Sequence, residues 1–81
     1  MNGLFIGGKI NMISKKLHIQ ESIKKAKNRI KTIESQIKEL KRDRNGSPSI
    51  HVKKIIDMEI KHREMMIHEL VRDIKGMNSL L

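Results

Sequence analysis

Apolar residues return at alternating spacings of three and four in two long stretches of the chain. The first stretch contains Ile23, Ala26, Ile30, Ile33, Ile37 and Leu40. The second contains Ile56, Ile60, Arg63, Ile67, Leu70, Ile74, Met77 and Leu81, where only Arg63 is charged. This spacing is typical of an amphipathic helix whose apolar stripe packs against another helix. The pattern therefore predicts two long helices that contact each other along these stripes.

The segment between the stretches, "KRDRNGSPSIHVK" at residues 41–53, contains the signals that end one helix and begin the next. Asn45-Gly46 predicts a helix C-terminus, because Gly accepts the left-handed conformation that often follows a helix. Ser47 is the expected N-cap, and Pro48 suits the first helical position, where its missing N–H costs nothing. So short a connection forces the helices to lie antiparallel. The expected fold is all-α, an antiparallel two-helix hairpin.

The expected boundaries follow from these signals. We expect helices at about 13–45 and 48–76, a turn at 45–48 and a short C-terminal tail, so that the hairpin occupies residues 13–81. Residues 1–12 contain three glycines, which disfavour helix, and are expected to be a flexible or weakly ordered segment.

Folding about the turn also predicts which residues meet. Ile33 should lie near Ile60, and the guanidinium of Arg63 should reach Glu59, one turn back along the same helix. At the start of the first helix a different stripe, offset from the later one, extends beyond the reach of the second helix. We expect it to form an apolar patch for another contact, made of Ile10, Ile13 and Leu17.

The second helix has more apolar surface than one stripe. Val52, Ile55, Met58, Met65 and Met66 form a second flank beside the first. A core this small supplies only about 3–5 kcal/mol, and an 81-residue chain without cysteine cannot add disulfides. The wide apolar arc therefore predicts a further partner, either a second copy completing a four-helix bundle or another protein. The expected contact residues on the second helix are Ile55, Met58, His62, Met65 and Met66.

The charge of +9 is concentrated in the first helix. Residues 1–45 hold twelve Lys and Arg against four Asp and Glu, whereas residues 46–81 hold six against five. One stripe beside the apolar seam, interrupted by Glu34, carries most of the excess. It contains Lys24, Lys27, Lys31, Lys38, Lys41 and Arg42. This ridge gives an alternative function, binding to the phosphate backbone of paired RNA or DNA.

Catalysis and cofactor binding find little support in the sequence. His62 with its neighbouring methionines could ligate a soft metal, but one histidine with thioethers and no cysteine is better explained as part of an interface. "GGK" at residues 7–9 lacks the spacing of a phosphate-binding loop. We expect no enzyme activity, cofactor, metal, small-molecule substrate or membrane contact.

These expectations combine into one functional hypothesis. The chain is expected to be a cytoplasmic, non-enzymatic protein-interaction module of regulatory or inhibitory type. Its helix faces would bind a protein partner, and the module would also form a homodimer. The Lys- and Ile-rich composition suits a low-GC bacterium or its phages.

Overall fold

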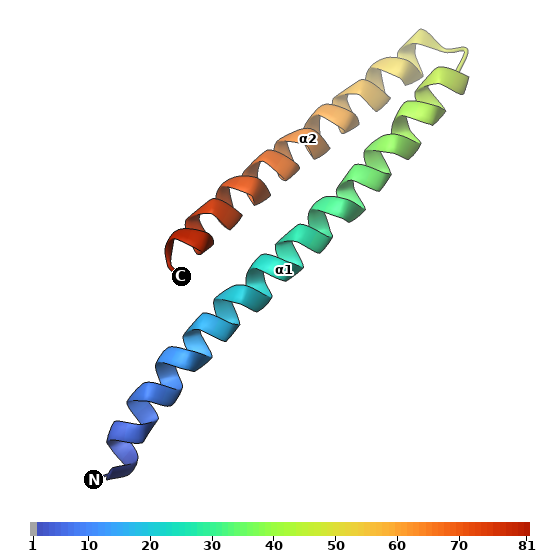
Figure 1. Ribbon diagram of the computed structural model, residues 1–81. Coiled ribbons are helices and arrows are strands. Elements are labelled where there is room, and N and C mark those ends of the chain that lie inside the picture. The colour runs from blue at the N-terminus through green and yellow to red at the C-terminus, as the bar shows by residue number, and fades with distance from the viewer. Residues whose placement is uncertain (1) are drawn as a thin grey trace.

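The protein is a helical hairpin drawn out into a rod of 72 × 16 × 14 Å. The computed structural model describes the backbone of residues 2–81 and the side chains of residues 14–81. Helix α1 spans Asn2–Gly46 and helix α2 spans Ile50–Ser79. The two helices run antiparallel and pack along the length of α2 (Figure 1). This arrangement confirms the predicted all-α hairpin.

The core of the hairpin is a narrow line of isoleucines where the two predicted stripes meet. Ile33 and Ile37 of α1 form one buried cluster with Ile60 of α2. Partly buried apolar side chains pack against this cluster, namely Leu40, Ile56, Met66, Ile67 and Leu70. Ile33 and Ile60 thus lie in the same cluster, as the folded-back register predicted.

Helix α1 begins much earlier than the sequence suggested. The backbone is helical from Asn2, so most of the segment 1–12, expected to be weakly ordered, belongs to α1. Each glycine costs only about 1 kcal/mol relative to Ala, and no proline interrupts the helix before the turn. Propagating an existing helix is much easier than nucleating a new one, which explains the difference.

The turn contains a second difference from the expectation. None of the described glycines has a positive φ, so Gly46 does not adopt the left-handed conformation. The helix instead runs through Gly46, and the N–H of Ser47 donates to the carbonyl of Arg44 at 3.3 Å. A tightened last turn of this kind satisfies a terminal carbonyl without a left-handed residue.

Helix α2 starts two residues later than predicted because the N-cap is Ser49 rather than Ser47. The hydroxyl of Ser49 accepts a hydrogen bond from the N–H of Val52 at 3.3 Å. Ser47 accepts from the N–H of Ser49 at 3.4 Å and so orders the chain before the cap. Pro48 therefore precedes the cap instead of occupying the first helical position.

At its other end α2 continues past Gly76, where the sequence suggested that it would stop. The hydroxyl of Ser79 donates to the carbonyl of Gly76 at 2.7 Å. The N–H of Leu80 donates to the carbonyl of Met77 at 3.1 Å. These short-range bonds satisfy the last carbonyls of the helix, so the tail reduces to Leu80 and Leu81.

The helical conformation of Gly46 leads to a prediction about its replacement by alanine. Gly46→Ala should stabilise the hairpin by a few tenths to about 1 kcal/mol, because Ala restricts the unfolded chain and favours helix. A Cβ at this position would meet no atom within 4 Å. Urea unfolding followed by circular dichroism at fixed protein concentration measures the change. A loss of more than about 1 kcal/mol would mean that Gly46 is left-handed after all.

Candidate functional site: the exposed faces of the hairpin

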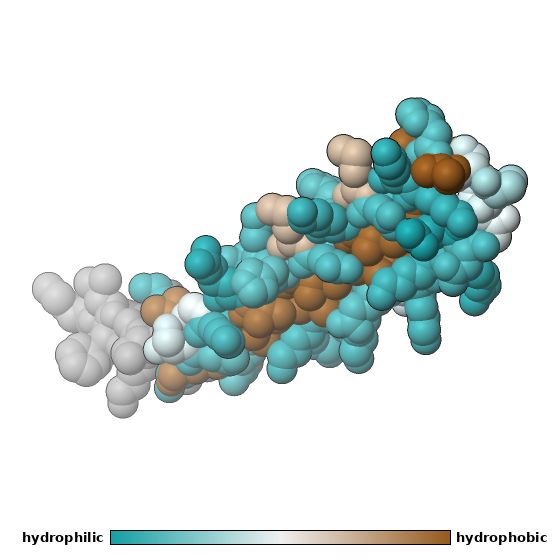
Figure 2. Space-filling view, turned by 90° about the horizontal axis from the view of Figure 1, so that it is seen from above, coloured by the Kyte–Doolittle hydropathy of each residue, from teal (hydrophilic) through white to brown (hydrophobic). Residues whose placement is uncertain are grey.

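The apolar seam between the helices is not completely buried. Even Ile33, the most buried of the described residues, retains 4% of its surface exposed. Figure 2 shows a continuous apolar band along one face of the rod, flanked on both sides by hydrophilic residues. Two helices can cover each other only along one line, so the flanks of both apolar stripes remain in contact with water.

An apolar stripe runs along a free flank of α2. The α2 stripe, as we call it, consists of residues spaced by four, three, four and three, namely His51, Ile55, Met58, His62 and Met65. Met58 is 73% exposed, Met65 is 58% exposed and Ile55 is 50% exposed. Both histidines are exposed as well. The sequence predicted four of these five residues as contact residues.

Met66, the fifth predicted contact residue of α2, lies elsewhere. It is half-buried and packs against the cluster of Ile33, Ile37 and Ile60. Its side chain therefore contributes to holding the hairpin together. The reason is its position on the helix, one residue beyond Met65 and so turned toward α1.

The N-terminal part of α1 has no counterpart in α2. Helix α1 has 45 residues and α2 has 30, so 15 residues, or about 22 Å, extend beyond the end of α2. Leu17 is 55% exposed near this overhang. The side chains of Ile10 and Ile13, the other two members of the predicted patch, lie outside the described residues.

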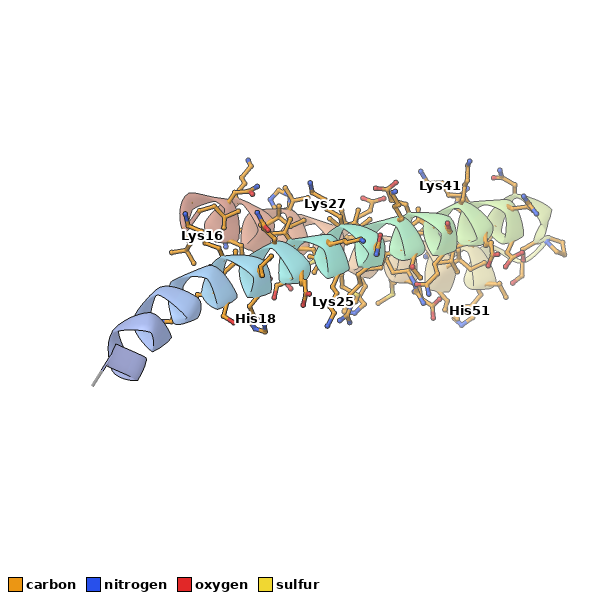
Figure 3. All side chains as sticks on the ribbon, turned by 60° about the horizontal axis from the view of Figure 1, so that its bottom comes forward. Lys16, His18, Lys25, Lys27, Lys41 and His51 are labelled. Carbon is orange, nitrogen blue, oxygen red and sulfur yellow. The ribbon has the colours of Figure 1, made fainter. Side chains whose placement is uncertain are left out.

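The basic ridge is exposed along its whole length. Its members are all solvent-accessible, namely Lys24, Lys27, Lys31, Lys38, Lys41 and Arg42. Figure 3 shows Lys27 and Lys41 on one side of the rod, with Lys25 and His51 on the other. His51, at one end of the α2 stripe, thus lies on the other side of the rod from Lys27 and Lys41 of the basic ridge.

Three polar side-chain contacts link or support the helices. Arg63 donates from Nε to Oε1 of Gln36 at 3.1 Å, and its Nη1 lies 3.6 Å from Oε2 of Glu59. Arg44 donates from Nε to Oδ1 of Asp57 at 2.6 Å. The contact of Arg63 with Glu59 was expected, whereas the two contacts across the seam were missed. Counting outward from the turn would have placed both pairs opposite each other.

These contacts contribute more to register than to stability. The side chains of Arg44 and Asp57 are 40% and 50% exposed, and ion pairs this exposed contribute about 0–1 kcal/mol. They nevertheless require one alignment of α1 against α2. The faces of the hairpin therefore hold fixed positions relative to each other.

No group of three His, Asp or Glu side chains comes together as a metal-ligand set in the part of the chain with described side chains. Neither helix, over the residues searched, contains a stretch that is long and apolar enough to cross a membrane. Comparisons with known protein families, curated proteins and solved structures found no match for this chain.

Proposed function

We propose that this protein is a non-enzymatic protein-interaction module, a helical hairpin that regulates or inhibits a partner by presenting helix faces to it. The observation that carries the proposal is the α2 stripe. Its apolar members are half to three-quarters exposed although they share one flank of a regular helix. Contiguous apolar surface at heptad spacing is characteristic of a helix-packing interface.

The first partner we propose is a second copy of the chain. Two hairpins packed through their α2 stripes would form a four-helix bundle and would bury Ile55, Met58 and Met65. The need for such a contact is physical, because a two-helix core with every described residue partly exposed has little stabilising burial.

The distribution of charge favours self-association through the α2 stripe over self-association through the basic ridge. The basic ridge lies on the other side of the rod from His51 (Figure 3). Packing through the α2 stripe would keep the two ridges apart, on the outside of the bundle. Packing through the ridge face would instead place lysines of one copy against lysines of the other, which is unfavourable.

Site-directed cross-linking tests this proposal, because the chain has no cysteine and a single introduced thiol is unique. Met58→Cys should give a covalent dimer in high yield with a short bis-maleimide. Lys27→Cys, on the basic ridge, is the matched control and should give no covalent dimer. Equal yields from the two variants, or no dimer from Met58→Cys, would overturn the proposal.

A further inference from the structure

Part of the basic ridge of α1 borders a shallow groove with largely basic walls. Two adjoining hollows of about 400 and 330 Å³ share Lys41. The first is lined by Lys31, Glu34, Ser35, Ile37, Lys38 and Lys41, and the second by Lys41, Arg44, Asn45, Asp57 and Ile60. The hollows thus follow α1 and reach the seam near the turn.

Each hollow of the groove has one apolar side chain in its lining, beside polar and charged ones. Ile37 and Ile60 each line one of the hollows, and both belong to the buried cluster of the hairpin. A ligand in this groove would meet the edges of these isoleucines at the seam and the positive charge of the lysines beside them.

From this combination we infer that the groove binds an acidic amphipathic helix of a partner protein. The ridge from Lys24 to Lys41 spans about 25 Å, the length of roughly 17 helical residues. Apolar side chains of such a helix would lie along the seam. Its carboxylates would face the lysines, as flanking charges do in coiled coils. This inference names the chemistry of the partner and extends the proposed function to a second face.

A second copy of this chain does not fit the groove. Residues 1–45 carry a net charge of +8, from twelve basic and four acidic residues, and residues 46–81 are nearly balanced, with six against five. The chain therefore has no strongly acidic helix to offer. Copies that met at this face would bring together side chains of like charge.

Nucleic acid fits the groove less well than an acidic helix does. A phosphate backbone gains nothing from the isoleucine in the lining of each hollow. Glu34 interrupts the ridge, and the guanidinium of Arg44 is already bonded to Asp57. The ridge consists mainly of lysines, which cannot read base edges by paired hydrogen bonds as arginine can, and Phe5 is the only aromatic residue in the chain.

The experiment measures binding of two labelled synthetic peptides to the full-length protein by fluorescence anisotropy. Both peptides are amphipathic helices with Leu at the a and d positions of the heptad. One carries Glu at e and g, and the other carries Lys there. We expect only the acidic peptide to bind, with an affinity that falls severalfold between about 50 and 200 mM salt.

Paired variants locate the binding site. Lys31→Glu with Lys38→Glu should weaken binding of the acidic peptide by about tenfold or more, because two lysines that line the groove reverse their charge. Lys25→Glu with Lys54→Glu changes the net charge equally at exposed positions that line neither hollow and should change affinity by less than about threefold. Glu34→Lys, which fills the gap in the ridge, should strengthen binding.

Three results would overturn the inference. The two double variants could lose affinity equally, which would indicate a general charge effect. The acidic peptide could fail to bind at all. A duplex DNA or RNA oligonucleotide could bind more tightly than the peptide with the same dependence on Lys31 and Lys38, which would establish the nucleic-acid alternative. Because Met58 lines neither hollow, cross-linking through it tests a different surface, and either proposal can fail without the other.

Discussion

Replacing Ile33 with Ala is expected to remove most of the stability of the hairpin. Ile33 is the most buried of the described residues and lies in one cluster with Ile37 and Ile60. Cutting a buried Ile back to Ala costs about 2–5 kcal/mol in lost burial and cavity formation. A chain of this size has only about 3–5 kcal/mol to lose. The variant should therefore be largely unfolded at room temperature, as far-ultraviolet circular dichroism would measure directly.

The matched control for Ile33→Ala is Ile50→Ala. Ile50 is 75% exposed in the first turn of α2, and exposed substitutions change stability by about 0.5 kcal/mol or less. Both variants lose the same three methyl and methylene carbons, so that only burial differs between them. If Ile33→Ala melted together with Ile50→Ala, the seam that we describe would not be the structural core.

The contrast between Ile33 and Ile50 also explains what could be predicted from the sequence. Ile33 lies on a stripe with a regular repeat, and the repeat alone predicts that it faces another helix. The antiparallel register then follows from the short turn. The two helices, their direction and their contact face could all be predicted from periodicity. The reason is that the same side-chain packing repeats along the whole length of a helix pair.

The helix ends were less predictable because local signals compete there. Ser47 and Ser49 are both residues of the type that caps helices. Ser49 is the cap because its hydroxyl accepts a hydrogen bond from the N–H of Val52, three residues later. Gly46 and Gly76 both favour a stop, yet a backbone already in helical conformation passes through each of them. Whether a helix ends at such a glycine depends on free-energy differences of about 1 kcal/mol between helical and non-helical backbone, which a sequence pattern does not resolve.

The candidate contact residues were predictable only in part. The heptad spacing identified Ile55, Met58, His62 and Met65, which share an exposed flank. Met66 was assigned to the same flank but packs toward α1, because adjacent residues of a helix point about 100° apart. The polar links from Arg63 to Gln36 and from Arg44 to Asp57 required the alignment of the two helices, which the sequence gives only approximately.

Replacing Met58 and Met65 with Lys is expected to abolish self-association while leaving the hairpin helical. Burying a Met side chain at an interface contributes about 1.5–3 kcal/mol, so losing two should raise the dissociation constant of the dimer more than a hundredfold. Lysines facing each other across the interface would weaken it further. Neither methionine belongs to the buried cluster of the hairpin, so the helices themselves should persist.

The control for the double lysine variant adds the same charge at another face. Asn28→Lys with Thr32→Lys places two lysines at exposed positions of α1 and should leave self-association intact within about threefold. Loss of association in both variants would attribute the effect to net charge instead of the α2 stripe. Retention in both would mean that the copies meet at another surface.

Sedimentation equilibrium of the unaltered chain tests the central claim most directly. The claim is that a two-helix hairpin with an exposed α2 stripe binds a second copy through it. The predicted result at micromolar concentration is a species of twice the 9.4 kDa chain mass that dissociates on dilution. A single species of 9.4 kDa that stays fully helical over the whole concentration range would contradict the account.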